Sequence, residues 1–386
     1  MKKQLTLSVL LASSLFSAGY QIPNNSINSA ALSTANVANA HGADASYYNP
    51  ANMVRSDYNG HEIESSLTFI SLGKINYAPS DGGANIQSKH HDALIPTFHY
   101  VSKKLNDKGV RVGFSIISPA GLAREWKDAP ASYTAKKFAL KTIEFNPTMA
   151  IPVNDKLSLG FGFRYVRATG KIALDAIPTS IDNGKDSASF GFNLAASYQA
   201  TDALNISTTY RSQVTLNLKG DANLPITSVN LEAPIPANFI LATAYKVTPT
   251  TTVEITYDRT MWSSVKETNF NNPNFGQPTP KKWHDTEAYR LGVTQNLDAI
   301  TLMGGLAYST NAADDAYVSF SSPESDSMTY SLGARYKLDE SIELGFAALY
   351  ADYASRTVAQ ASPIGVNGTL SDKDALSLTM GLNYRF

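Results

Sequence analysis

Three arginines, Arg164, Arg211 and Arg290, are the residues in this sequence best suited to bind a charged ligand. A planar guanidinium group donates paired hydrogen bonds to a carboxylate. Each arginine occupies a polar position in a stretch where apolar and polar residues alternate, so we expect all three on one polar, inward-facing surface. They are therefore candidate carboxylate-binding residues. The alternative is that they anchor a plug or pair with interior acids such as Glu62, Glu64, Glu254 and Asp258.

Other kinds of site find little support among the 386 residues. The chain has no cysteine, which excludes disulfides, cysteine–zinc sites and thiol catalysis. Its histidines show no metal-ligand spacing, and the adjacent His90 and His91 would point to opposite faces of a strand. No motif brings a serine, a histidine and an acid together. We expect no metal, no cofactor and no enzymatic activity; a hydrolase site assembled from distant strands is the alternative.

The charge balance and the N-terminus indicate where the protein resides. Lys and Arg number 32 and Asp and Glu 33, with no basic tract, so nucleic acid is not an expected partner. Lys2 and Lys3 precede the apolar run Leu5 to Phe16, and small residues follow. This pattern predicts a secretory signal peptide over residues 1–17. No later stretch reaches the roughly 18 to 20 apolar residues of a membrane helix.

The dominant pattern of the remaining chain has a period of two. Every second residue from Leu376 to Phe386 is apolar, and polar or small residues lie between them. The same alternation recurs along the chain and predicts long strands with one apolar and one polar face. The fourteen expected strands span residues 60–77, 91–104, 110–118, 136–151, 155–173, 186–200, 203–219, 229–246, 250–268, 283–297, 300–311, 326–337, 341–355 and 373–386.

Very short connections alternate with longer ones, as in a closed antiparallel barrel whose two ends lie on the side of the short turns. A soluble β-sandwich is the alternative, but its strands average about five or six residues. The strands expected here have about ten or more, which is enough to cross a bilayer. The terminal Tyr384 and Phe386 resemble the assembly signal of bacterial outer-membrane barrels. We therefore predict an all-β, fourteen-stranded transmembrane barrel over residues 60–386 in the bacterial outer membrane, recognised by the barrel assembly machinery.

A barrel of this size raises the question of what fills its interior. Eight strands leave a lumen that side chains fill, and sixteen to eighteen leave an aqueous channel. Residues 18–59 lack strand alternation and are rich in Ala and Asn, which pack well against a polar wall. We predict that this segment is an N-terminal hatch that plugs the lumen. The alternative is a disordered leader.

Several motifs resemble the FadL/TodX family of outer-membrane transporters. The hatch would begin at Ala18-Gly19-Tyr20-Gln21 and carry the signature Asn49, Pro50 and Ala51. Ser118 to Leu122, the Leu157 to Phe163 strand, Tyr210-Arg211-Ser212, Lys219-Gly220-Asp221 and Ala288-Tyr289-Arg290 follow in the family's order. The resemblance covers the whole mature chain.

The resemblance implies passive uptake of long-chain fatty acids or other hydrophobic molecules, including the aromatic hydrocarbons of the TodX branch. The expected partners are this ligand, outer-membrane lipid and lipopolysaccharide, and the expected oligomeric state is a monomer. The alternative is a non-specific porin or a structural barrel such as an adhesin. One departure is that the connections at 174–185 and 220–228 are short, where fatty-acid members have extended loops that form an external groove.

The residues at the end of the third expected strand predict a break in the barrel wall. Pro119 cannot donate a ladder hydrogen bond and Gly121 permits a bend, so pairing should fail over Ser118, Pro119, Ala120 and Gly121. A gap beside the hatch would be a lateral opening into the bilayer, which is also the exit that the resemblance implies. The alternative is that Pro119 only ends the strand at the rim.

Overall fold

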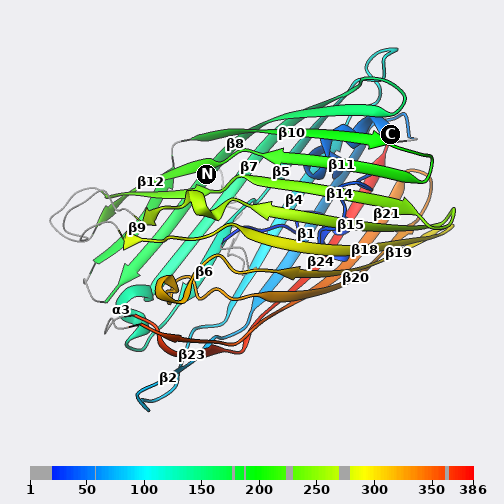
Figure 1. Ribbon diagram of the computed structural model, residues 1–386. Coiled ribbons are helices and arrows are strands. Elements are labelled where there is room, and N and C mark those ends of the chain that lie inside the picture. Colours follow the sequence, from blue (N-terminus) through cyan, green and yellow to red (C-terminus); the bar gives the residue numbers. More distant parts are fainter. Residues whose placement is uncertain are drawn as a thin grey trace, which may run out of the picture.

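The computed structural model describes residues 20–386 except 57, 176–178, 187, 223–228, 269–278 and 361–364. The predicted signal peptide lies outside this part of the chain. Antiparallel strands form a closed barrel in which β1 pairs with both β4 and β24 (Figure 1). The fourteen wall positions are β1 (Glu62–Leu72), β4 (His91–Val101), β5 (Arg111–Ile117) continued by β6 (Gly121–Glu125), β7 (Lys137–Pro152), β8 (Leu157–Leu174), β10 (Ser189–Gln199), β11 (Leu204–Arg211), β14 (Asn238–Lys246), β15 (Thr251–Thr260), β18 (Thr286–Leu297), β19 (Ile300–Ser309), β20 (Ser327–Lys337), β21 (Ile342–Tyr353) and β24 (Lys373–Arg385).

The polarity of this barrel is the reverse of that of a soluble protein. Outward-facing side chains are large and apolar; Leu332 is 72% exposed and Phe346 57%. Inward-facing positions carry buried polar residues such as Ser377 and Thr379. An apolar outer face opposite a polar interior is the pattern of a barrel surrounded by lipid. The predicted fold class is confirmed.

The two ends of the barrel differ. One end, here the turn end, carries the six short connections at 102–110, 153–156, 200–203, 247–250, 298–299 and 338–341, and also the C-terminus (Figure 1). The other end, the loop end, carries the remaining elements. These are β2 (Asn76–Pro79), β3 (Ile86–Gln87), α3 (Ala131–Ala135), β9 (Thr179–Asp186), β12 (Val214–Ala222), β13 (Val229–Ile235), η2 (Trp262–Ser264), β16 (Glu267–Thr268), β17 (Thr279–Pro280), η4 (Asp315–Tyr317), β22 (Arg356–Ala359) and β23 (Asn367–Ser371). In the described residues, no helix is long and apolar enough to cross a membrane.

Four predicted strands are divided or shortened. The strand expected over 250–268 ends at Thr260, and η2 and the two-residue β16 follow it. The strand expected over 203–219 breaks at Ser212 into β11 and β12, because the Ser212 backbone N–H bonds to the Phe192 carbonyl at 2.9 Å while β12 pairs with β9 and β13. The strand expected over 229–246 breaks at Pro236, which has no N–H to donate. The first strand ends at Leu72, and residues 76–79 join a small sheet with β3 and β23. The connections expected to be short carry the β9 strand and the β12–β13 hairpin, and 176–178 and 223–228 lie outside the described residues.

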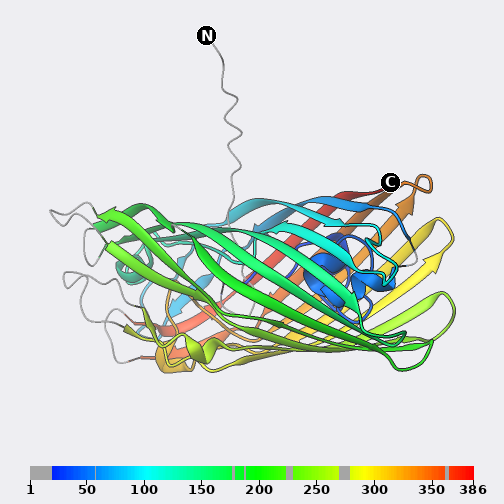
Figure 2. The ribbon, with the colours of Figure 1, turned by 90° about the horizontal axis from the view of Figure 1, so that it is seen from above.

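The segment that follows the predicted signal peptide lies inside the barrel from Tyr20 onward. It forms α1 (Ile27–Ala31), α2 (Ala45–Tyr48) and η1 (Pro50–Arg55), and Figure 2 shows these helices within the wall, nearer the turn end. Wall glycines make room for it. A Cβ atom at Gly305 would overlap the Leu32 backbone, and one at Gly160 would overlap the Ala51 backbone. Glycine is therefore required where this segment meets the wall.

Candidate functional site

One carboxylate of the barrel wall holds the internal segment by its backbone. Glu254 Oε1 accepts hydrogen bonds from Val37 N at 2.6 Å and Ala38 N at 3.1 Å, and Oε2 accepts one from Asn39 N at 2.7 Å. Among the described residues, no cation lies within 4.0 Å of this carboxylate. Three converging N–H groups therefore take the place of a counter-ion, as in backbone anion-binding turns.

The predicted hatch signature supports the same loop from its other side. Asn49 Nδ2 donates to the Val37 carbonyl at 2.8 Å. Pro50 occupies the start of η1, where its missing N–H costs nothing, and Ala51 lies against Gly160. The side chains of Asn49 and Glu254 thus hold the carbonyl and N–H groups of one loop. That these residues are a functional signature stays a prediction.

All three predicted arginines face the interior, and each has an acidic partner. Arg164 Nη2 lies 2.9 Å from Glu144 Oε2, and Arg211 donates to the other oxygen of Glu144. Arg164 is 2% exposed and Glu144 0%. The Arg211 guanidinium also lies over the Tyr47 ring, 4.1 Å from its centre. Two positive charges share one carboxylate, so a positive charge remains on this side of the lumen.

Arg290 lies apart from this pair. Its Nη2 is 3.1 Å from Asp258 Oδ2, and its Nη1 donates to the Ser33 carbonyl at 3.0 Å. It therefore both pairs with an acid and anchors the internal segment. The sequence reasoning named Asp258 as a possible partner but missed Glu144. The alternation of Thr142, Glu144 and Asn146 on the buried face of β7 is the signal that would have found it.

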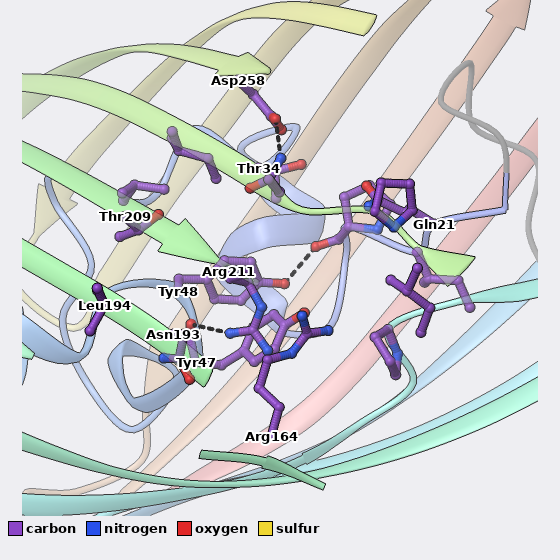
Figure 3. A pocket seen from close by; sticks show the side chains of 18 of the residues that line it. Gln21, Thr34, Tyr47, Tyr48, Arg164, Asn193, Leu194, Thr209, Arg211 and Asp258 are labelled. Atoms are coloured by element: carbon purple, nitrogen blue, oxygen red, sulfur yellow. Dashed lines mark hydrogen bonds between the residues drawn. The ribbon is translucent and has the colours of Figure 1, made fainter. Parts of the chain in front are cut away.

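An inner cavity of about 80 Å³ connects the arginines to the interrupted strand. Arg164 and Arg211 line it together with Tyr47 and Tyr48 of α2 (Figure 3). Pro119 and Ile22 line it as well. A cavity with cationic and apolar walls suits a molecule that has a polar head and an apolar body.

The third strand is interrupted where proline was expected to interrupt it. β5 ends at Ile117 and β6 begins at Gly121, and both pair with β7. β5 pairs with β4 only over Phe98–Val101, so residues 91–97 of β4 have no ladder partner on that side in the described chain. The break extends into the wall and does not merely end the strand at the rim.

The start of the internal segment occupies this break. Ile22 N donates to the Pro119 carbonyl at 3.0 Å, and Gly121 N donates to the Tyr20 carbonyl at 2.8 Å. On the other side, Ala120 N donates to Thr142 Oγ1 at 3.0 Å. A three-residue stretch from inside the barrel thus pairs with the interrupted part of strand three.

A second, outer cavity of about 120 Å³ lies toward the loop end. For comparison, a dry cavity of about 150 Å³ is known to hold benzene. Most of its lining residues are apolar; they include Tyr20, Leu122, Phe138, Leu140, Ile172, Leu218 and Trp283. Lys281 is a basic residue in its lining, and burial lowers the pKa of this amine.

Tyr20 separates the outer cavity from the break in strand three. Its ring packs edge-on against Trp262 with 5.0 Å between centres, and its hydroxyl donates to the Pro234 carbonyl. The sequence reasoning missed Tyr20, Trp262, Trp283 and Lys281 as site residues. The two tryptophans follow β15 and precede β18 in a long connection, a position that could have indicated a loop-end site.

The C-terminal aromatic residues close the barrel at the turn end. His61 N donates to the Phe386 carbonyl at 2.7 Å, and the Phe386 ring stacks on those of His61 and Tyr384 at 5.2 Å and 5.5 Å. Recognition of Tyr384 and Phe386 by the assembly machinery stays a prediction. In the described part of the chain, no group of three or more potential metal ligands is present.

These features define a class of protein: a transmembrane β-barrel with an apolar outer face that encloses part of its own chain. The chain belongs to the family described as outer membrane protein transport protein (OMPP1/FadL/TodX), whose model matches residues 8–386. It is therefore an outer-membrane protein of a family that transports hydrophobic small molecules.

Relatives and solved structures agree with this placement. The chain is 26% identical over 351 residues to outer membrane protein P1 of Haemophilus influenzae, covering 76% of this chain and 74% of that one. It is 26% identical over 346 residues to the long-chain fatty acid transport protein of Escherichia coli O6:H1, with the same coverage of 76% and 74%. A Pseudomonas aeruginosa FadL homologue superposes with a TM-score of 0.82 at 18% identity, covering 95% and 100% of the two chains. The Pseudomonas putida toluene transporter TodX gives 0.72 at 15% identity, covering 95% and 99%.

Proposed function

We propose that this protein is a passive transporter that takes up long-chain fatty acids or similar hydrophobic molecules and releases them sideways at strand three. The observation that carries the proposal is the break at Ser118–Ala120, which Tyr20–Ile22 contacts from inside the barrel and which borders the inner cavity. Uptake of aromatic hydrocarbons is the alternative, supported by the name of the TodX structure.

The order of the cavities suggests a route. A ligand would first enter the apolar outer cavity, whose lining removes its chain from water. Movement of Tyr20 and Gln21 would then open the way to the inner cavity, and displacement of Ile22 from Pro119 would open the wall between β4 and β6. The backbone hydrogen bonds at this contact number two, and each is worth about 1 kcal/mol net. Thermal motion is sufficient to break them, so the route needs no energy source.

The excess positive charge at Glu144 supports a role for Arg164 and Arg211 in holding a carboxylate in the inner cavity. A ligand carboxylate would compete with Glu144 for Arg211, the less buried of the two arginines. Arg290 would contribute by keeping the internal segment in place. A neutral hydrocarbon would make no use of the two arginines.

The internal segment is, in this proposal, a hatch over residues 18–59 that blocks ion flow through the lumen, and residues 60–386 are the barrel. The turn end would face the periplasm and the loop end the lipopolysaccharide. The protein would act as a monomer without enzymatic activity or nucleic acid, after insertion by the barrel assembly machinery. An open porin would instead pass a large ion current.

Restoring the strand tests the proposed exit. Pro119→Thr with Gly121→Val adds a backbone donor and raises strand propensity. Uptake of palmitate by cells should fall severalfold, while the level of the protein in the outer membrane and ligand binding by the purified protein persist. The control is Pro152→Thr with Gly304→Val, at the turn end and on the outer face. Full uptake by the first variant would refute lateral release.

A further inference from the structure

The outer face of the barrel carries a cluster of basic side chains toward the loop end of β7, β8 and β12. On each of these strands the odd-numbered residues face outward, away from the buried even-numbered ones. Four of the five basic side chains are exposed, and that of Lys141 is half-buried. This cluster, here the basic surface, comprises Lys137, Lys141, Arg167, Lys171 and Lys219.

Strand register brings three of these charges close together. Lys141 is the register partner of Thr169 on β8, so it lies diagonally between Arg167 and Lys171. Diagonal neighbours in an antiparallel pair are about 7 to 8 Å apart. The positive charge of Lys171 acts on Lys141. Like charges at this separation repel one another, and a phosphate group placed among them is bound favourably.

Lys219 supplies a second positive region in the same row of the sheet. Thr169 pairs with position 185 of β9, and that position pairs with Lys219 on β12. Neighbouring strands lie about 4.8 Å apart, so the spacings from β7 through β8 and β9 to β12 place Lys219 about 14 Å from Lys141 along the wall. The basic surface therefore presents two positive regions that are separated along the rim.

Aromatic side chains form an apolar surface next to the basic one, on its turn-end side. The ring centres of Phe145 and Tyr165 are 5.9 Å apart, and the Phe190 ring lies 5.5 Å from that of Tyr165 and 5.7 Å from that of Phe163. Phe163 and Phe190 are exposed, so this surface faces the hydrocarbon of the membrane. Arg167 Nη1 donates to the Tyr165 hydroxyl at 3.2 Å, which joins the two surfaces. Acyl chains could therefore pack on the rings while their headgroup phosphates reach the basic surface.

Outward-facing charges elsewhere on the loop-end rim include several acids. Glu287 lies on β18, and Asp352 and Asp374 are register partners on β21 and β24. Arg259 of β15 also faces outward, but it pairs with Asp285. Charge alone would therefore direct a polyanion to the side of the rim formed by β7, β8 and β12.

We infer that the basic surface and the aromatic rings next to it bind the lipid A part of lipopolysaccharide. Lipid A carries a phosphate at each end of a disaccharide and several acyl chains, which match separated positive regions beside a wide apolar surface. A phospholipid offers a single phosphate. The site relies on the orientation given in the proposed function, with the loop end toward lipopolysaccharide, and does not rely on transport. Because Lys141 is the register partner of Gly121, the bound lipid would lie beside the loop-end edge of the strand-three break.

The test titrates purified protein in a nonionic maltoside detergent with diphosphoryl lipid A, monophosphoryl lipid A or phosphatidylglycerol, and measures bound lipid by native mass spectrometry. The wild type should bind diphosphoryl lipid A most tightly. Lys141→Gln, Arg167→Gln and Lys171→Gln together should weaken this binding at least roughly tenfold, the effect of losing one hydrogen bond to a charged group. Lys219→Gln should reduce the preference for the diphosphoryl over the monophosphoryl form, because it removes the second positive region.

Arg259→Gln is the control, because it removes an outward-facing positive charge outside the basic surface, and it should leave the affinity for diphosphoryl lipid A unchanged. Equal affinity in the wild type and the triple variant would overturn the site. So would phosphatidylglycerol that binds the wild type as tightly as diphosphoryl lipid A does.

The orientation is tested separately by labelling Thr357→Cys, at an exposed position of β22, with a membrane-impermeant maleimide. Labelling of intact cells is the expected result. Labelling only after permeabilisation would refute the orientation given in the proposed function, and with it the encounter of this site with lipopolysaccharide in the cell. Lipid binding by the purified protein would not change that conclusion.

Discussion

Glu254→Gln should loosen the internal segment without unfolding the barrel. The Glu254 carboxylate accepts three hydrogen bonds from the backbone N–H groups of residues 37–39. The glutamine amide has only one acceptor oxygen, and its NH₂ group would face backbone N–H groups with which it cannot bond. Losing one or two bonds to a charged group costs about 3 kcal/mol. Removing a buried charge offsets part of this cost, which leaves about 2 kcal/mol. Each 1.4 kcal/mol changes an equilibrium constant tenfold. The fraction of molecules in which this loop is detached from the wall should therefore be roughly 30 times larger in the variant than in the wild type.

Single-channel recording in planar bilayers measures this effect. The wild type should be nearly closed, and Glu254→Gln should show more frequent or longer conducting events with the same heat-modifiable migration on gels. Glu287→Gln is the matched control, because the Glu287 carboxylate accepts hydrogen bonds from the outward-facing Tyr257 and Tyr289. Asn49→Ala should raise the conductance less in the Glu254→Gln background than in the wild type, because the side chains of Asn49 and Glu254 hold the same loop. Conductance identical to that of the wild type would refute the anchoring role of Glu254.

Three further predictions concern the lumen. Deleting residues 21–48 should leave a folded, heat-modifiable barrel whose conductance is well above that of the intact protein; an unchanged current would mean that this segment is no plug. Gly305→Val should displace α1 and raise conductance, because its side chain would overlap the Leu32 backbone, whereas the outward-facing Gly304→Val should not; equal currents for both would contradict the close approach. Arg211→Gln should weaken binding of palmitate severalfold more than binding of hexadecanol, measured by competition for a fluorescent fatty acid; equal losses would assign Arg211 to structure alone.

The strands and their inward and outward faces could be predicted because the alternation of apolar and polar residues within each strand determines them. In the alternating stretch from Leu376 to Phe386, Leu382 is exposed, whereas Ser377 and Thr379 are buried. Side chains of a strand point alternately to its two faces, so in a wall between lipid and a polar interior the apolar residues must face the lipid. The interruption at Pro119 could also be predicted from the local sequence, because proline lacks the N–H group that the ladder of hydrogen bonds requires.

The partners of the interior side chains could not be predicted in the same way. Glu254 binds backbone 217 residues away, and Arg211 binds Glu144 across two intervening wall strands. Such contacts depend on how far the internal segment enters the barrel and on the stagger between strands. The alternation of apolar and polar residues contains no information about either.

The most direct test of the account is a reversible lock across the break. Gln21 and Ala120 are antiparallel bridge partners, and the chain has no native cysteine. Cross-strand Cα atoms about 4.5 to 5.5 Å apart suit a disulfide. Gln21→Cys with Ala120→Cys should therefore abolish palmitate uptake when oxidised and restore it on reduction, while the level of the protein in the outer membrane stays the same. Thr68→Cys with Thr379→Cys locks two interior register partners elsewhere and should transport in both states. Full uptake by the oxidised Gln21–Ala120 pair would contradict lateral release at strand three.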